Sequence, residues 1–254
     1  MENFGSLILP LLLSALVGYL LGSISFAILL TKAFAHEDVR AHGSGNAGAT
    51  NVLRVAGKKA SALTFLLDFC KCVASVLVGY FLVKHACVAN GVDPEMARLG
   101  MYAAGFCCMI GHMYPLYFGF RGGKGVVTTA AMMLLLDWRV FLICFAVFLL
   151  VFLKKRMVSL SSITAAAIYP VVTFCMTYFV DCCVGGLPVL YVVMATLVAA
   201  LIGATVIIKH RANIRRIRNG TESTISFNGK NKCKAQYLYR KRRANGRVWH
   251  FSFT

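Results

Sequence analysis

The chain contains 254 residues with a mass of 27.7 kDa, and 59% of the residues are hydrophobic. Only 14% are charged, against about 25% in an ordinary soluble domain, and the mean hydropathy is +0.71. This composition excludes a disordered chain, a coiled coil and an ordinary soluble enzyme. Residues 4–30 and 182–208 carry no charge over 27 residues each, more than the ~20 that cross a bilayer. Because these runs are continuous and do not alternate, they exclude an outer-membrane barrel and predict an all-α, polytopic integral membrane protein.

Apolar runs recur along the chain and are separated by short polar segments. In chain order they cover residues 4–30, 60–83, 99–120, 125–136, 140–153, 157–180 and 188–208. The two runs beside Asp137 can be read as one long helix or as two short ones. Two helices place every basic connection on one side, so the positive-inside rule favours about seven spans, with the N-terminus outside and the C-terminus cytoplasmic. The first short span would rise only about 18 Å, so it must lie inside the protein.

Basic residues outnumber acidic ones by 27 to 9, which gives a net charge of +18. Residues 209–254 hold 13 of the 27 basic residues and one acid, Glu222, and apolar periodicity stops after Gly220. We interpret residues 1–222 as one membrane-embedded domain and 223–254 as a basic cytoplasmic tail, either disordered or bound to the membrane surface. Nucleic-acid binding is not supported, because no recognition motif accompanies the charge.

Three polar segments interrupt the apolar pattern on the predicted cytoplasmic side, at residues 43–54, 111–125 and 210–220. Their glycines allow backbone N–H groups to form an anion-binding nest. Gly122-Gly123-Lys124-Gly125 leads directly into an apolar run, and the start of such a helix attracts phosphate. The segment is not a complete P-loop, since glycine and not Ser or Thr follows the lysine, which disfavours an ATPase. Together the segments predict a pocket for phosphorylated molecules at the edge of the bilayer.

The first polar segment also supplies suitable side chains. Ser44, Asn46, Thr50 and Asn51 offer short hydrogen-bonding groups, and Arg54 offers a bidentate fork for phosphate.

Four other ionisable residues are candidates for a supporting or proton-transferring role. His112 and His210 lie beside predicted helix ends, where imidazole can titrate near neutrality. Asp68 and Lys71 lie three residues apart in one apolar run, so they share a helix face and can pair. We favour a pair that supports the pocket over a proton pathway.

These motifs resemble a known family. The resemblance rests on the run from Asp38-Val39-Arg40 through GSGNAGATNVLR, followed in order by GHMYPLYFGFRGGKGV, VSLSS and HRANIRRIRNGTE. Residues 1–222 closely resemble the bacterial acyl-phosphate:glycerol-3-phosphate acyltransferases, the PlsY family. The resemblance implies a seven-span enzyme of the bacterial inner membrane with a cytoplasmic active site. It implies transfer of a fatty acyl group from acyl phosphate to the 1-hydroxyl of sn-glycerol 3-phosphate, giving lysophosphatidate and phosphate. This is the first acylation of phospholipid synthesis.

The resemblance also assigns the site residues. It gives catalytic roles to His210, Asn213, Lys124 and Arg54. The phosphate-binding set comprises Ser44, Gly45, Asn46, Gly48, Thr50, Asn51, Arg54, Gly122, Gly123, Lys124, Gly125 and Ser159. The supporting candidates are His112, Asp68, Lys71 and Glu222. Ala47 stands where the family often has proline, but its neighbouring glycines remain, so we do not expect lost activity.

The expected partners are the two substrates and membrane lipids, with no metal, no cofactor, no nucleic acid and no obligate protein partner. Acyl phosphate is already activated and no G-x-S-x-G elbow is present, so no covalent acyl-enzyme is expected. Catalysis then rests on proximity and charge stabilisation, with either His210 or a substrate phosphate as the base. The alternative is a membrane transporter of a phosphorylated or anionic solute, because the short spans in 125–153 fit broken transporter helices.

Overall fold

The computed structural model describes residues 4–225, and every regular element in this range is helical, which confirms the predicted all-α class. The α-helices are α1 (Ile8–Gly22), α2 (Phe26–Ala35), α3 (Ala49–Val55), α4 (Gly57–Asn90), α5 (Ala97–Met113), α6 (Val126–Leu136), α7 (Trp138–Lys155), α8 (Val158–Cys175), α9 (Val189–Lys209) and α10 (Arg211–Arg218). A π-helix over Met176–Cys182 continues α8, and 3-10 turns cover Phe4–Leu7, Val39–Ala41, Pro94–Met96 and Leu116–Phe118.

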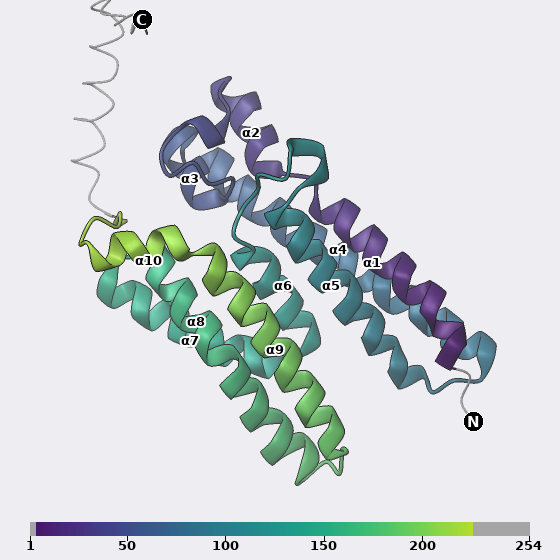
Figure 1. The fold of residues 1–254 in the computed structure, drawn as a ribbon. Helices are drawn as coiled ribbons and strands as arrows, with labels where there is room; N and C mark the ends of the chain where they lie inside the picture. Colours follow the sequence, from purple (N-terminus) through teal and green to yellow (C-terminus); the bar gives the residue numbers. More distant parts are fainter. Residues whose placement is uncertain (1–3, 226–254) are drawn as a thin grey trace, which may run out of the picture.

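The long helices form two groups that lie side by side (Figure 1). One group contains α1, α4 and α5, which pack against one another, and the other contains α7, α8 and α9. The short helix α6 contacts α4 and α5 on one side and α7 on the other, so it joins the two groups. This position inside the protein is the one that its length requires, because an 11-residue helix cannot span the hydrocarbon core.

The apolar runs are broken at places that the sequence only partly signals. The predicted division beside Asp137 is confirmed: this residue ends α6, and its carboxylate accepts hydrogen bonds from the first N–H groups of α7. The run predicted over 4–30 is interrupted at residues 23–25, where the Ser23 hydroxyl donates to the Tyr19 carbonyl. The run predicted over 99–120 is also too long, because α5 ends at Met113 and Pro115 follows directly.

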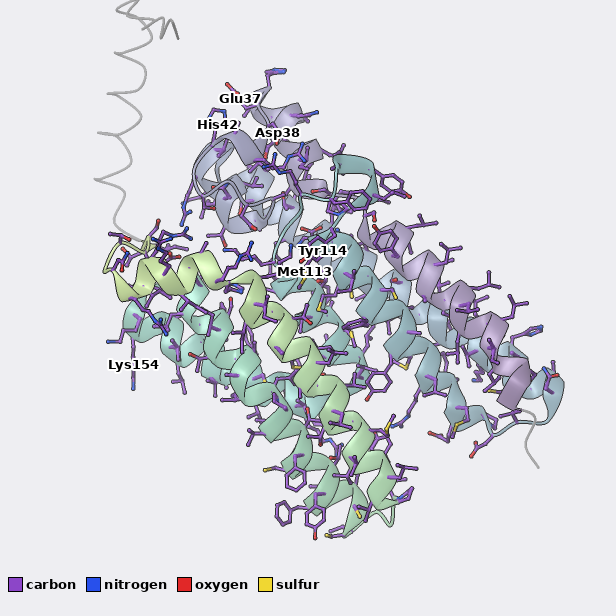
Figure 2. The ribbon with its side chains drawn as sticks, viewed as in Figure 1. Glu37, Asp38, His42, Met113, Tyr114 and Lys154 are labelled. Atoms are coloured by element: carbon purple, nitrogen blue, oxygen red, sulfur yellow. The ribbon has the colours of Figure 1, made fainter. Side chains whose placement is uncertain are left out.

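Four helical stretches within the described residues are long and apolar enough to cross a membrane: Gly5–Ala35, Gly57–Asn90, Val158–Cys182 and Val189–Lys209. The total of seven spans and the side on which each terminus lies stay predictions. The loops before α3 and before α6 lie at one end of the molecule, where α2, α3 and α10 are also found (Figure 1). Glu37, Asp38 and His42 lie at this end, and Lys154 lies beside α10 (Figure 2).

Glycines allow the backbones of α4 and α5 to touch. A Cβ atom placed on Gly79 would overlap the Gly100 carbonyl, and one placed on Gly100 would overlap the Gly79 carbonyl. Small residues at such crossings replace the hydrophobic effect, which is absent between helices in lipid, with close van der Waals contact. The α4–α5 pair is therefore held by direct backbone contact at this crossing.

Gly100→Val should destabilise the protein by about 1–3 kcal/mol or more, because the added side chain forces the two backbones apart. Thermal unfolding in detergent measures the effect. The matched control is Leu99→Val, since Leu99 lies next in sequence and is 42% exposed on the outer face of α5. Equal unfolding midpoints for the two variants would contradict the packing described here.

Candidate functional site

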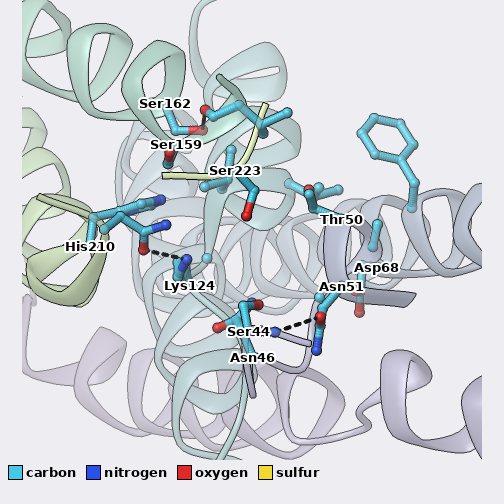
Figure 3. A pocket seen from close by; sticks show the side chains of 18 of the residues that line it. Ser44, Asn46, Thr50, Asn51, Asp68, Lys124, Ser159, Ser162, His210 and Ser223 are labelled. Carbon is cyan, nitrogen blue, oxygen red and sulfur yellow. Dashed lines mark hydrogen bonds between the residues drawn. The ribbon is translucent and has the colours of Figure 1, made fainter. Parts of the chain in front are cut away.

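A cavity of about 180 Å³ opens at the polar end of the bundle, between the two helix groups. Segments far apart in the sequence supply its walls: the loop before α3, the loop before α6, the start of α8, and the region from α9 to residue 225. Figure 3 shows side chains from all of them directed toward the same space. The three predicted polar segments therefore meet in one place, as the sequence analysis requires.

Most of the predicted residues line this cavity: Ser44, Asn46, Gly48, Thr50, Asn51, Arg54, Asp68, His112, Lys124, Gly125, Ser159, His210, Asn213 and Glu222. The other four candidates, Gly45, Gly122, Gly123 and Lys71, lie outside the lining. Within residues 4–225, no group of three His, Cys, Asp or Glu side chains is arranged to hold a metal ion. The expectation of a metal-free, cofactor-free site stays a prediction.

The carboxylate of Glu222 holds one wall of the cavity together. Its Oε1 accepts hydrogen bonds from Ser159 Oγ and Asn213 Nδ2, each at 2.7 Å, and its Oε2 accepts one from Arg216 Nε at 2.7 Å. Asn213 Oδ1 in turn accepts a hydrogen bond from Lys124 Nζ at 2.6 Å. One chain of hydrogen bonds thus joins α8, α10 and the loop before α6.

This network changes the protonation of two of its members. Burial alone would raise the pKa of Glu222, but hydrogen bonds from Ser159, Arg216 and Asn213 outweigh burial and lower it, so the group is ionised at neutral pH. Burial lowers the pKa of Lys124 to about 8, against the opposing attraction of Glu222. Lys124 is thus a desolvated cation whose direct partner is a neutral amide.

His210 is the best-buried titratable group of this wall, with 2% of the residue exposed. Its Nδ1 lies 2.8 Å from the carbonyl oxygen of Val206, which can only accept, so Nδ1 carries the hydrogen. The lone pair is therefore on Nε2. Burial lowers the pKa of His210 to about 4, so the imidazole is neutral at physiological pH and serves as a hydrogen-bond acceptor.

The first polar segment is shaped by its own side chains. Asn51 is almost fully buried, and its Nδ2 donates to the carbonyls of Val39 and His42, each at 2.9 Å, while its Oδ1 accepts from the Ser44 N–H at 3.0 Å. The amide is thus occupied by the loop. Arg40 links this loop to the second segment, because its Nη1 donates to the Phe118 carbonyl at 2.6 Å.

The loop that carries Lys124 ends at the start of α6. Gly125 adopts a φ of +79°, a left-handed conformation that favours glycine, and no side chain caps the helix. The first residues of α6, Val126 and Val127, line the cavity. The positive end of the helix dipole therefore adds to the charge of Lys124 at this wall.

The charges around the cavity do not cancel. Within residues 4–225, Glu222 is paired with Arg216 and Asp68 with Lys71. Arg54 and Lys124 line the same space, and neither forms an ion pair with a described carboxylate. Two uncompensated cations in a half-enclosed cavity favour an anionic ligand.

A second cavity, about 170 Å³ and almost wholly apolar, continues from the first between α4, α6, α7, α8 and α9. The two cavities share five lining residues: Phe65, Val126, Val127, Phe148 and Ser162. A polar chamber at the end of the bundle therefore opens into an apolar one between the helices. This shape suits an amphiphile with an anionic head and a hydrocarbon chain.

Several members of the site were not found from the sequence. Arg216 is not among the predicted residues, although its spacing of three residues from Asn213 on a helix gives a usable signal. Phe65 and Phe148 gave no signal, because they look like any other apolar residue of a span.

Ser223 and Ile225 also line the cavity, and the Ile225 N–H donates to the Arg156 carbonyl at 2.8 Å. The predicted boundary after residue 222 thus falls inside a segment that packs on the site, and residues 226–254 lie outside the described part.

Comparison with known proteins agrees with this geometry. The family model for glycerol-3-phosphate acyltransferase matches residues 12–220. The chain belongs to the glycerol-3-phosphate acyltransferase family. It is 40% identical to the glycerol-3-phosphate acyltransferase of Clostridioides difficile (strain 630) over 89% of this chain and 98% of that protein. It is 41% identical to the glycerol-3-phosphate acyltransferase of Mesorhizobium japonicum over 86% of this chain and 98% of that protein.

Solved structures of a relative show the same fold. The crystal structure of PlsY, an integral membrane glycerol 3-phosphate acyltransferase, in its glycerol 3-phosphate form superposes with a TM-score of 0.66 at 38% identity, covering 85% of this chain and 96% of that one. Its lysophosphatidic acid form gives a TM-score of 0.64 at 37% identity. The prediction of a multi-pass membrane acyltransferase is confirmed, and the transporter alternative is set aside.

Glu222→Gln should lower the free energy of unfolding at pH 7 by about 1–3 kcal/mol, because it removes the charged partner of Arg216. The pKa of Glu222 is lowered in the folded state, so its contribution is present above the ordinary glutamate pKa and is lost as pH falls through the folded value. The difference between wild type and variant should therefore shrink as pH falls. Thermal unfolding in detergent at pH 7 and pH 4 measures it, and an equal difference at both pH values would contradict the role of the carboxylate.

Proposed function

We propose that the polar cavity binds glycerol 3-phosphate beside the phosphate of an acyl phosphate, while the apolar cavity holds the acyl chain. The observation that carries this proposal is the continuity of the two cavities, with Lys124 in the polar one and aromatic side chains where they join. Arg54, Lys124 and the start of α6 offset the mutual repulsion of two phosphates. The chemistry of a phosphorylated, long-chain donor fits both chambers at once.

The reaction follows from this arrangement. The 1-hydroxyl oxygen of glycerol 3-phosphate attacks the acyl carbon, and the bond from that carbon to the phosphate oxygen breaks. The phosphate leaves with the bonding electron pair, and lysophosphatidate remains. A phosphate with a pKa near about 6 is a stronger base than His210, whose pKa is about 4. The leaving phosphate therefore takes the proton of the 1-hydroxyl, and His210 Nε2 orients the glycerol by accepting the hydrogen bond of the neighbouring 2-hydroxyl.

The remaining candidates have supporting tasks. Ser44, Asn46 and Thr50 are the neutral donors for the phosphate oxygens, with Ser159 and Asn213 held in place by Glu222. Asn51 acts on the substrate indirectly by fixing the loop that carries Ser44. The whole arrangement works by proximity, which can contribute roughly 7–11 kcal/mol to lowering the barrier.

We infer the orientation in the membrane from charges at the two ends of the bundle. Lys154 and α10, which carries four arginines, lie at the end that holds the cavity (Figure 2). The turn from α4 to α5, which contains Asp93, and the π-helix after α8, which contains Asp181, lie at the other end (Figure 1). By the positive-inside rule, we expect the cavity to face the cytoplasm from the bacterial inner membrane. Both substrates then reach the site from the side on which soluble phosphorylated metabolites are found.

The assay that tests the proposal gives purified protein in lipid vesicles an acyl phosphate and labelled glycerol 3-phosphate. Lysophosphatidate and inorganic phosphate should appear in equal amounts, and acyl-CoA should not replace acyl phosphate. Lys124→Ala and Arg54→Ala should each lower kcat/KM at least tenfold. Lys58→Ala, which removes an exposed lysine outside the cavity, is the matched control. Normal rates in the first two variants, or acylation from acyl-CoA alone, would contradict the proposal.

The apolar cavity should set the length of the acyl chain. Ala165→Phe adds a ring where Ala165 lines this cavity, so the preference should move toward shorter acyl phosphates. Ala167→Phe is the matched control, because Ala167 is exposed on another face of α8. Initial rates across a series of chain lengths measure the preference. An unchanged profile in Ala165→Phe would show that the chain lies elsewhere.

A further inference from the structure

The proposed function leaves one buried group of ionisable side chains without a task. Asp68, Lys71 and His112 have only 2%, 4% and 6% of their side chains exposed. Lys71 Nζ lies 2.7 Å from Asp68 Oδ1 and 3.3 Å from His112 Nδ1, which is itself 3.5 Å from Asp68 Oδ1. Charges between apolar helices are costly, and apolar side chains of similar size pack there at less cost, so the group calls for an explanation.

Lys71 ties this group to the break between α1 and α2. Its ammonium donates to the Gly22 carbonyl at 3.1 Å and the Ile24 carbonyl at 2.6 Å, and the end of α1 leaves such carbonyls unpaired. These bonds explain why a cation lies at this depth. They do not explain why a histidine lies beside it.

His112 ties the group to the loop that carries Lys124. Its carbonyl accepts the Gly123 N–H at 3.0 Å. A Cβ atom on Gly123 would overlap His112 Nε2, and one on Gly122 would overlap the His112 carbonyl. The loop therefore rests directly on this histidine, and the absence of side chains at both glycines allows the contact.

Asp68 and Lys71 hold the imidazole from α4. The ammonium of Lys71 lies within hydrogen-bond distance of the Gly22 and Ile24 carbonyls and of Asp68 Oδ1, and His112 Nδ1 lies against the same pair, 3.3 Å from Lys71 Nζ and 3.5 Å from Asp68 Oδ1. Nε2 is the atom that faces Gly123. The ring orientation is thus set by α4 before any substrate binds.

We propose that Asp68, Lys71 and His112 form a positioning network that holds Gly122–Lys124 at the height where the Lys124 ammonium meets the substrate phosphate. None of the three needs to touch the reacting atoms. The attraction between the ammonium and a phosphate falls as they move apart, so a displaced Lys124 should weaken substrate binding. The inference rests on the proposed function, because it assumes that Lys124 binds a phosphate.

The test uses the double variant Asp68→Asn with Lys71→Met, which removes both charges and leaves neither unpaired. Its Kd for glycerol 3-phosphate, from calorimetry on the full-length protein in detergent, and its KM should rise at least tenfold, while kcat changes less than threefold. A purely structural role would lower the unfolding temperature without moving KM. Asp181→Asn, which weakens the Arg139 ion pair away from the site, is the matched control and should leave Kd and KM unchanged.

His112→Ala keeps the Asp68–Lys71 pair and serves if the double variant does not fold. It should raise KM as much, and His112→Gln, whose side chain fills part of the same space against Gly123, should recover part of the loss. If the folded double variant or folded His112→Ala has the KM of the wild type, the positioning role of the network is contradicted, while the proposed function stands. Failure of the wild-type protein to bind glycerol 3-phosphate would overturn the proposed function and this inference together.

Discussion

An ammonium group buried without a carboxylate partner is the feature on which the site depends. Lys124 donates to the neutral amide of Asn213, while the nearest carboxylate, Glu222, uses both oxygens for other donors. No carboxylate of the described residues therefore forms an ion pair with Lys124, although Glu222 and Asp68 line the same cavity. A cation in that position gains most from an anion that arrives with the substrate, because little water is left to compete with it.

The fold allows the buried ammonium of Lys124 and the irregular loop that carries it to exist in a membrane protein. Irregular backbone within a bilayer is tolerated only where it is covered by protein or lines a cavity. Here the break at residues 23–25 is covered by Lys71, which donates to the Gly22 and Ile24 carbonyls, and the break at 114–125 packs on His112 and ends at the cavity. The half-length helix α6 lies between the two helix groups, so its uncapped start can face the polar space.

The same arrangement gives the two cavities different chemistry. Phe65, Phe148 and the first residues of α6 stand where the polar chamber ends and the apolar one begins. Under the proposed function, the phosphate of the donor stays with the cations while its acyl chain extends between the helices. Both reacting groups are then held at the boundary, as transfer by proximity requires.

Much of this was accessible from the sequence, because it depends on local patterns. Charge-free runs predicted the helices, and glycine with lysine before an apolar run indicated the loop that brings Lys124 to the polar cavity. Contacts between distant segments were not accessible: Glu222 was only a supporting candidate, and Arg216 was hidden in a basic run. The breaks at Ser23 and Met113 were also missed, because apolar composition alone does not show where backbone hydrogen bonds end. Asn51 looked like a phosphate ligand because an amide's partners cannot be read from its position.

The most direct test of the account is the number of protons taken up when glycerol 3-phosphate binds. Burial lowers the pKa of Lys124 to about 8, and a bound phosphate should raise it again. Calorimetry at pH 9 in buffers of different ionisation enthalpy should show uptake of nearly one proton per site, and Lys124→Ala should abolish the uptake and weaken binding at least tenfold. Binding without proton uptake, and with equal affinity in that variant, would contradict the central role of the buried ammonium.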